Sequence, residues 1–316
     1  MIREGKMKDF DRKILTNLFI PEDKSHKGQN GRLLIIGGSH LFHSASLWSL
    51  KVASRIVDLV HYSSVPENNA IVAKLKEEFR DGIVVPRAEI ESYIEEDDCI
   101  LIGPGMVRAK SAELSNYPIN PASPAGRQLS NLKEIIKLGN EGVQTYFLTK
   151  YLLQKYPKKK WVIDAGALQM MEPEWITSTM IITPHHGEFE TLKLKIKNEK
   201  LKMTMKNLDI ADQIYLFAKE FGCAVLHKGQ TDYVCNRKEC YRVKGGNAGM
   251  TKGGTGDVLA GLTAAFYCKN EALTSAASAS FINKKSGEDL YQTKGYWFNA
   301  SDLADQIPKT MKKLLL

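Results

Sequence analysis

The stretch GNAGMTKGGTGDVLAGL, residues 246–262, has five glycines in its first eleven residues and one acidic residue, Asp257. From about Thr255 onward its apolar residues recur at helical spacing, which predicts a helix. Glycines let the backbone approach a ligand closely, and free N–H groups at the amino end of a helix attract an anion. The stretch therefore predicts an anion site, suited to phosphate, at the start of this helix.

Asp257 lies in the first turn of the predicted helix, and two interpretations of it stay open. It is either a favourable helix-terminal residue, worth about 1 kcal/mol, or a base that takes a proton from a hydroxyl group attacking the phosphate. In the second case the glycine N–H groups stabilise charge on the transferred group. The stretch matches neither the Lys-Ser/Thr ending of a Walker loop nor the spacing of the dinucleotide fingerprint.

The elements that must position this site alternate along the chain. Helices are predicted within 45–57 and 207–222, and buried strands within RLLIIGG (32–38), DDCILIGPG (97–105), WVIDAGAL (161–168), MIITPHHGE (180–188) and CAVLHKG (223–229). This alternation is typical of a mostly parallel sheet with helices on both faces. The least regular segment, residues 107–130, predicts a long surface loop or flap.

Glycines and polar residues gather where the predicted strands end: Gly37, Gly38, residues 103–105, Asp164, residues 185–188, Lys228 and Gly229. Open α/β sheets bind their ligands outside the carboxyl ends of the strands. We therefore expect these residues to surround one ligand site.

The composition is that of a globular chain, with 316 residues, 43% hydrophobic residues, a net charge of +8 and a pI of about 9.0. This length predicts one or two domains. The positive charge is scattered, as in residues 155–160 and 193–206, without interleaved aromatic residues. This pattern argues against nucleic-acid binding and favours a solvated basic face or phosphate-bearing ligands.

The five cysteines lie mostly within apolar segments, which predicts reduced, buried thiols in a reducing compartment: Cys99, Cys223, Cys235, Cys240 and Cys268. Cys235 and Cys240 are close enough in sequence to suggest a clip, but no second pair or nearby histidine completes a zinc site. The N-terminus alternates charges where a signal peptide needs an apolar stretch, and no run reaches the roughly 20 apolar residues of a membrane span. We expect a cytoplasmic protein without membrane attachment.

Six blocks in order resemble the ribokinase-like superfamily, and within it the family of ADP/ATP-dependent NAD(P)H-hydrate dehydratases. They are HKGQNGRLLIIGGS (26–39), GPGM (103–106), VIDAGAL (162–168), ITPHHGEFETL (182–192), LHKGQTDYV (226–234) and GNAGMTKGGTGDVLAGLTAAF (246–266). The resemblance implies a carbohydrate-kinase-like, three-layer α/β sandwich with a mostly parallel central sheet. Residues 21–316 would form this single domain, with residues 1–20 as an N-terminal extension.

The resemblance also implies a reaction. The terminal phosphate of ADP or ATP passes to the hydroxyl group on the hydrated nicotinamide ring of NADH or NADPH, and elimination of phosphate restores the double bond. No electrons are gained or lost, so the reaction needs no flavin, and Mg²⁺ carried on the nucleotide suffices.

The site residues implied by the resemblance come from the matching blocks. Asp257 would be the base, beside an anion hole of Gly253, Gly254, Thr255 and Gly256. The nucleotide would contact Lys228, Gly229, Gln230, Thr231, Asp232 and Gly256. The hydrated dinucleotide would contact Ala45, Gly105, His185 and Asp257.

Four further interpretations stay open in pairs. His185 either binds the dinucleotide or is a solvated turn residue, and Glu188 either orients Mg²⁺ through water or interacts with a helix N-terminus. Asp164 either contacts magnesium-bound water or caps the following turn. Lys228 either neutralises phosphate or extends across the surface.

Three departures from the family pattern are expected on the substrate side. Ser44 stands before Ala45 where the family has glycine, GPGLG is shortened to GPGM, and Asp58 replaces a glycine-containing turn. The alternative function is therefore a ribokinase-like kinase that phosphorylates a hydroxylated metabolite or vitamin precursor and keeps the product. A third is nucleotide binding without turnover, against which Asp257 argues.

The expected partners follow from the same resemblance. Many members of the family are fused to an epimerase domain that interconverts the two hydrate forms. Because only about 20 residues precede the match, we expect this chain to act on one epimer beside a separate epimerase. Symmetric assemblies are common in the family, so a homo-oligomer is expected as well.

Overall fold

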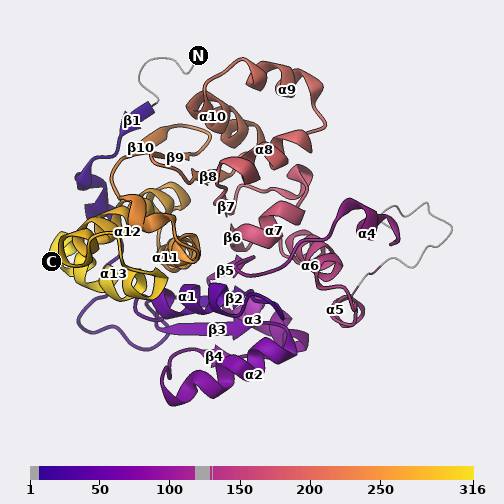
Figure 1. Ribbon diagram of the computed structural model, residues 1–316, viewed down its shortest axis with the longest axis horizontal. Helices are drawn as coiled ribbons and strands as arrows, with labels where there is room; N and C mark the ends of the chain where they lie inside the picture. The colour runs from indigo at the N-terminus through magenta and orange to yellow at the C-terminus, as the bar shows by residue number, and fades with distance from the viewer. Residues whose placement is uncertain (1–6, 118–128, 130) are drawn as a thin grey trace.

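The computed structural model describes residues 7–117, 129 and 131–316, and its centre is a ten-stranded sheet (Figure 1). The strands lie in the order β1-β10-β9-β8-β7-β6-β5-β2-β3-β4, and all neighbours are parallel except β8–β9 and β9–β10. Their bounds are β1 (Met7–Asp9), β2 (Arg32–Ile36), β3 (Leu59–Ser63), β4 (Ile83–Val84), β5 (Cys99–Ile102), β6 (Lys160–Ile163), β7 (Met180–Ile182), β8 (Ala224–His227), β9 (Asp232–Cys235) and β10 (Cys240–Val243).

Helices cover both faces of this sheet. The α-helices are α1 (Ser44–Ala53), α2 (Pro66–Lys74), α3 (Ile90–Glu96), α4 (Ser111–Ser115), α5 (Leu132–Ile135), α6 (Glu141–Lys155), α7 (Ala165–Met170), α8 (His186–Leu194), α9 (Glu199–Lys206), α10 (Ile210–Phe221), α11 (Thr255–Lys269), α12 (Ala272–Lys294) and α13 (Ala300–Leu315). Short 3₁₀ helices are η1 (Arg12–Asn17), η2 (Leu75–Glu77), η3 (Arg87–Glu89), η4 (Pro173–Trp175) and η5 (Ala248–Thr251). None of the described helices is long and apolar enough to cross a membrane.

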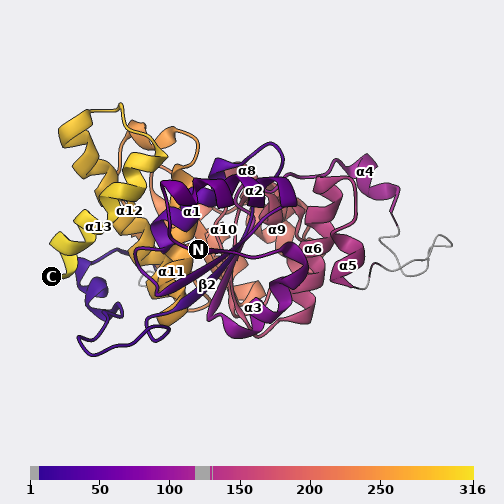
Figure 2. The same ribbon diagram turned by 90° about the horizontal axis from the view of Figure 1, so that it is seen from below.

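Alternate residues of the central strands belong to two separate cores. In β2, Leu33 and Ile35 pack in the core that contains α1, α11, α12 and α13, whereas Leu34 and Ile36 pack in the core that contains α3, α6, α7 and α10. Side chains of a strand alternate between faces, so each face of the sheet is buried. Figure 2 shows α12 and α13 on the opposite side of the molecule from α5 and α6. The predicted three-layer α/β sandwich with a mostly parallel sheet is confirmed.

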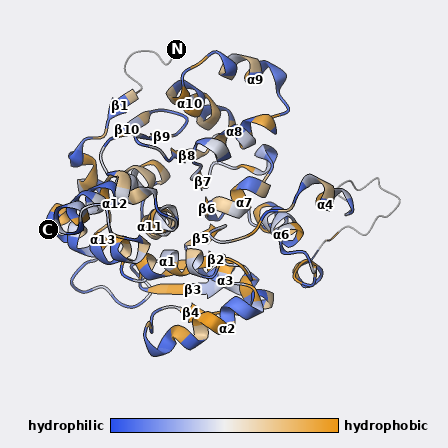
Figure 3. Cartoon of the chain, in the orientation of Figure 1, coloured by the Kyte–Doolittle hydropathy of each residue, from blue (hydrophilic) through white to orange (hydrophobic). Residues whose placement is uncertain are grey.

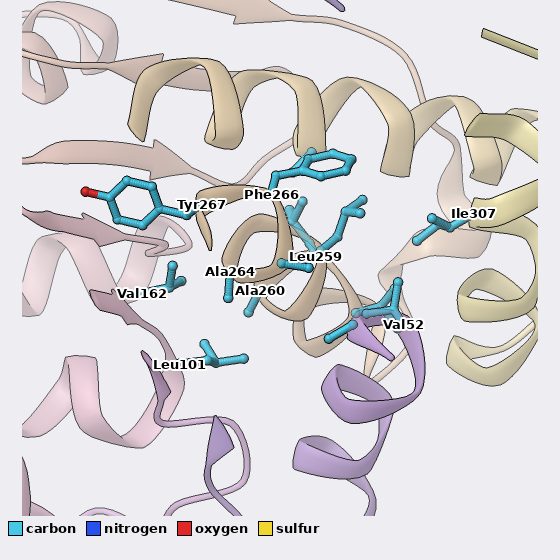
Figure 4. Close-up of a cluster of buried hydrophobic side chains, with 14 of the residues drawn as sticks. Val52, Leu101, Val162, Leu259, Ala260, Ala264, Phe266, Tyr267 and Ile307 are labelled. Carbon is cyan, nitrogen blue, oxygen red and sulfur yellow. The ribbon is translucent and has the colours of Figure 1, made fainter. Parts of the chain in front are cut away.

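Helix α11 lies at the centre of the first core (Figure 4). Its Leu259 and Ala264 pack between sheet residues and the neighbouring helices, and each fully buried large apolar side chain contributes roughly 1.5–3 kcal/mol. Gly261 lets α11 approach α1 so closely that a Cβ there would lie 2.6 Å from the Cα of Ser49. The Ser49 hydroxyl of α1 donates to the Asp257 carbonyl oxygen at 2.7 Å, so α1 holds the first turn of α11 in place.

Residues 107–130 contain more regular structure than expected. The structure forms α4 within the part of this segment that it describes, and Asn140 donates to Glu113 of α4 at 3.1 Å. Residues 118–128 and 130, which belong to the predicted loop, lie outside the described residues. At the other end of the chain, β1 pairs in parallel with β10.

The prediction of five reduced thiols is wrong for Cys235 and Cys240. These residues are directly paired in the antiparallel β9–β10 hairpin and form a disulfide. The hairpin turn brings the two Cα atoms to 4.1 Å. Cys99, Cys223 and Cys268 are free and buried, as predicted.

Candidate functional site

The carboxyl ends of β5, β6 and β8 meet at one edge of the sheet. Gly103, which follows β5, has φ +125°, and a Cβ there would overlap the Asp164 carbonyl group. Asp164 is followed by Ala165, which has φ +43°, an uncommon backbone conformation for a residue other than glycine. Strained backbone of this kind is often found at functional sites. Here it accompanies the abrupt change from β6 to α7 that places the Asp164 side chain.

Lys228, the residue after β8, is the centre of a cluster of charges. Its Nζ donates to Asp164 Oδ1 at 2.7 Å and lies 3.9 Å from Glu188 Oε2. Burial lowers the pKa of Lys228, but the carboxylates of Asp164, Glu188 and Asp257 outweigh this effect and raise the pKa above its usual value. Lys228 therefore stays charged and points into the site, so it does not extend across the surface.

Asp164 is held by this cluster and does not cap the following turn. Its Oδ1 accepts from both Lys228 and the Thr183 hydroxyl, each at 2.7 Å, and it makes no side-chain cap to α7. Glu188 interacts with the N-terminus of α8, whereas its role in orienting Mg²⁺ stays a prediction. It forms a capping box with His185 at the start of α8, while its Oε1 accepts from Gln169 at 3.0 Å.

The electrostatics of Asp257 differ from those of other first-turn carboxylates. Burial, together with Asp164 and Glu188 and against the opposing effect of Lys228, raises the pKa of Asp257 to about 7. By contrast, Lys294 lowers the pKa of Asp302 at the equivalent position of α13. A residue that served only to stabilise the helix N-terminus would have a lowered pKa. The raised pKa is typical of functional carboxylates, and the role of Asp257 as a base stays a prediction at this point.

The glycine loop directly ahead of α11 contains a left-handed residue, Gly254. Gly254 is the N-cap of α11, has φ +95° and offers no side chain to cap the helix. The first i→i−4 hydrogen bond of the helix runs from Val258 N to Gly254 O. The amides before Val258 therefore have no i→i−4 partner within the helix. The Thr255 hydroxyl is already used, because its single proton is shared between Met250 O at 2.7 Å and Lys252 O at 2.9 Å.

A cavity of about 840 Å³ opens beside this loop. Its lining includes all five residues of 228–232, as well as Thr255 and Gly256. The cavity is therefore large enough for a nucleotide and brings together most of the predicted nucleotide residues. Gly253, Gly254 and Asp257 do not belong to its lining.

The 228–232 loop is braced from α12, which the sequence did not indicate. Lys284 Nζ donates to Gly229 O at 3.0 Å and to Gln230 O at 3.1 Å. Asp232 accepts from Gly229 N at 2.8 Å and from the Ser280 hydroxyl at 2.7 Å, so its carboxylate supports the loop. Asn283 also lines the cavity. No motif marks these α12 residues, because they are spread along an ordinary helical pattern.

The predicted substrate residues fall in two places. Gly105 and Ala45 are neighbours, since a Cβ at Gly105 would lie 3.0 Å from the Ala45 Cβ. His185 lines a different cavity of about 470 Å³, together with Glu188 and Lys195, and its exposed ring accepts from Glu188 N as a helix cap. The contact of these residues with a dinucleotide stays a prediction.

Asp58 is not on the substrate side, contrary to expectation. It precedes β3 at the amino end of the strand, where it accepts from Gly28 N at 2.7 Å and Asn30 N at 3.0 Å. At this position, where the family has a glycine-containing turn, the Asp58 carboxylate anchors the loop that leads into β2 through these two hydrogen bonds. Ser44, at the start of α1, is exposed.

Comparison with solved structures defines the class of protein. A ribokinase-like superfamily protein from Enterococcus faecalis superposes with a TM-score of 0.75 at 22% identity, over 99% of this chain and 98% of that one. The ADP/ATP-dependent NAD(P)H-hydrate dehydratase of Bacillus subtilis, co-crystallised with ATP/Mg²⁺, superposes with a TM-score of 0.71 at 19% identity, over 97% and 98%. The fold is ribokinase-like, with a nucleotide-sized cavity at the carboxyl edge of the sheet.

Sequence comparison narrows this class to one family. The family model described as NAD(P)H-hydrate dehydratase matches residues 136–309. The ADP-dependent (S)-NAD(P)H-hydrate dehydratase of Nitrosopumilus maritimus is 32% identical over 94% of this chain and 95% of its own length. The chain belongs to the NAD(P)H-hydrate dehydratase family, which confirms the resemblance found in the sequence. It is also 32% identical to the bifunctional NAD(P)H-hydrate repair enzyme of Methanocaldococcus jannaschii, but spans about half (50%) of that protein's length.

We expect Gly254→Val to destabilise the fold and weaken nucleotide binding. A Cβ at Gly254 would overlap the Trp48 ring and lie 2.7 Å from the Ala300 Cβ, and φ +95° is strained for valine. The stability loss should be at least about 1 kcal/mol, measured by urea unfolding, with ADP affinity measured by calorimetry. At Gly253 a Cβ meets nothing within 4 Å, so Gly253→Ala is the matched control with unchanged stability. Equal stability of the two variants would contradict this account of the loop.

Proposed function

We propose that this protein catalyses the ADP- or ATP-dependent dehydration of hydrated NADH or NADPH, a metabolite-repair reaction. The observation that carries the proposal is Asp257. It is a carboxylate with a pKa of about 7, at the amino end of α11, within the electrostatic range of Lys228 and next to the residue Gly256 that lines the nucleotide cavity. Membership of the dehydratase family supplies the substrate.

The first step is phosphoryl transfer. Asp257 takes the proton of the ring hydroxyl group, and the hydroxyl oxygen forms a bond to the terminal phosphorus of the nucleotide. The bond between that phosphorus and the bridging oxygen of the nucleotide breaks. The amides of the glycine loop and the Lys228 ammonium stabilise the charge on the transferred group. We assign these amides to residues 253–256, among which the Thr255 amide also donates to Lys252 O at 3.4 Å, and the Thr255 hydroxyl holds the loop through the carbonyl groups of Met250 and Lys252.

The second step is elimination. The ring nitrogen's lone pair expels the phosphate, which is a far better leaving group than hydroxide, and loss of a proton from the adjacent ring carbon restores the double bond. The products are inorganic phosphate and NADH or NADPH. The acceptor side of the site is formed by Ala45, in the first turn of α1, and its neighbour Gly105.

Mg²⁺ belongs to this proposal as a companion of the nucleotide. Among the described residues there is no group of three or more His, Cys, Asp or Glu side chains that forms a metal cage. Asp164 and Glu188 carry two negative charges against the single positive charge of Lys228, and carboxylate oxygens are suitable ligands for Mg²⁺. These two residues would face the hydrated ion, which would neutralise phosphate charge when bound.

The wider setting is proposed on the same basis. The N. maritimus relative is named as ADP-dependent, and the B. subtilis structure was obtained with ATP/Mg²⁺. The proposal therefore keeps both ADP and ATP as phosphoryl donors. Bifunctional relatives support a second repair activity, which we assign to a separate epimerase. A cytoplasmic homo-oligomer completes the proposal.

The test follows absorbance at 340 nm, the band of reduced nicotinamide. Purified protein is mixed with hydrated NADH, Mg²⁺ and either ADP or ATP, with a reaction lacking nucleotide as the control. A nucleotide-dependent rise with stoichiometric release of inorganic phosphate is expected. Bound nucleotide with no rise, or a stable phosphorylated product, overturns the dehydratase and favours a kinase.

We expect the reaction to depend on pH with a midpoint near 7. Asp257 accepts a proton only when ionised, and its pKa is raised to about 7. The value of kcat/KM, which reports ionisations of the free enzyme, should therefore fall about tenfold per pH unit below 7 and reach a plateau above it. Initial rates between pH 5 and 9 measure this profile, with a blank for spontaneous loss of NADH in acid. A plateau that extends down to pH 5 would rule out a base with this pKa.

A further inference from the structure

A second cavity of about 670 Å³ lies at the β3–β4 edge of the sheet, apart from the nucleotide cavity. It is bounded by α2, by the chain after β4, and by the segment between α5 and α6. Most of its walls are apolar, with contributions from Val65, Ala70, Ala73, Val84, Ile136 and Leu138. Figure 3 shows the apolar stretch of α2 in orange, next to β4.

The unusual member of this cavity is Arg87, which is only 7% exposed. Its Nη1 donates to Gln144 Oε1 at 3.0 Å and its Nη2 to Gly37 O at 3.3 Å. Its Nε has no acceptor among the described residues. Both of the acceptors are neutral, so hydrogen bonds orient the guanidinium without compensating its charge.

The buried charge of Arg87 has no direct counterion in the described part of the chain. The carboxylate that acts on it, Glu141, is engaged elsewhere and accepts from the backbone N and the ring Nδ1 of His40, at 3.2 and 3.0 Å. Burial lowers the pKa of Arg87 to about 10, which still leaves it charged at neutral pH. An unpaired buried charge costs several kcal/mol, and an anion that enters the cavity would recover part of this cost.

We propose that this cavity binds an amphipathic anion, with a carboxylate or phosphate head against Arg87 and an apolar body against the α2 and α5–α6 walls. The head group provides a charge-assisted hydrogen bond, and the body buries apolar surface at Ala70, Ala73 and Leu138. Two sources share this chemistry. The anion is either a separate small metabolite or the end of the dinucleotide substrate that is furthest from its nicotinamide ring.

The site is connected to the substrate side of the protein. Arg87 donates a hydrogen bond to the Gly37 carbonyl oxygen, and Glu141 accepts one from His40 N. Both of these cavity residues therefore bind the segment that runs from β2 into α1. Ala45 lies at the start of that helix. An occupant of the cavity therefore contacts the residues that set the position of this segment.

The test measures binding by calorimetry with sodium octanoate as the probe and octan-1-ol as its uncharged counterpart. We expect octanoate to bind wild-type protein at least roughly tenfold more tightly than octanol, the worth of one charge-assisted hydrogen bond. Arg87→Met should remove this preference, and Arg80→Met, at an exposed arginine on the same edge, should retain it.

A second variant covers the case in which Arg87→Met does not fold. Ala70 is exposed at the cavity mouth, so Ala70→Trp should fold normally and block both probes. Equal binding of octanoate and octanol, no binding of either, or an unchanged preference in Arg87→Met would overturn the proposal. Displacement of octanoate by NADPH assigns the site to the substrate's far end, and no displacement assigns it to a separate metabolite. None of these measurements requires turnover, so failure of this binding proposal can be distinguished from failure of the proposed dehydratase reaction.

Discussion

Replacing Asp257 with asparagine is expected to lower the dehydration rate by roughly 10² to 10⁴, the usual contribution of a general base. Asparagine keeps the size of the side chain but cannot accept the hydroxyl proton. The N-cap of α11 is Gly254, which does not depend on the Asp257 side chain, so the helix should still form. Nucleotide binding should stay nearly intact, because Asp257 does not line the nucleotide cavity. The measurement is kcat from the 340 nm assay, with ADP affinity from calorimetry on the same preparation.

Asp212→Asn is the matched control for this substitution. Asp212 lies in the first turn of α10, as Asp257 does in α11, but in a helix on the other face of the sheet. Loss of its charge should cost at most about 1 kcal/mol of stability and leave kcat unchanged. If Asp257→Asn resembled this control, with reduced stability and full turnover, Asp257 would be a helix-terminal residue and the proposed mechanism would lose its base.

The central part of the fold was predictable because its strands are buried on both faces. The structure places β2, β5, β7 and β8 inside predicted ranges, where continuous apolar runs end at glycine or a polar residue, and β6 begins one residue before its range, at Lys160. The outer strands carry no such signal. The edge strand β4 has only two residues, and the other edge strand, β1, is mostly exposed. A short strand at a sheet edge needs no apolar run, so periodicity does not detect it.

The site was predictable where its chemistry is local in sequence. The glycines and Asp257 occupy one stretch, so their relation to the helix start could be predicted. The ion pair between Lys228 and Asp164 joins residues 64 positions apart, and the brace from Lys284 reaches back more than 50 positions to the 228–232 loop. Such pairs depend on which strands become neighbours. The misplacement of Asp58 has the same origin, because the sequence did not indicate at which end of β3 it would lie.

Lys228→Met is expected to have two effects that can be separated. Because Lys228 pairs with the buried Asp164 and lies near Glu188, removal of its charge leaves two uncompensated carboxylates, at a cost of about 3 kcal/mol or more of folding stability. The phosphoryl group also loses a positive charge, so kcat should fall by roughly 10² or more. Urea unfolding and the 340 nm assay measure the two effects. Lys197→Met, at a side chain that is 81% exposed, is the control and should change stability by at most about 0.5 kcal/mol.

The double variant Lys228→Met with Asp164→Asn separates stability from catalysis. Asp164→Asn removes one of the two uncompensated carboxylates and leaves Glu188, so it should restore part of the lost stability, but it cannot restore turnover. The pH profile gives a further readout. Lys228 opposes the rise in the pKa of Asp257, so in Lys228→Met the midpoint of kcat/KM should move above 7. A stable variant with full turnover and an unchanged midpoint would limit Lys228 to holding the ends of β6 and β8 together.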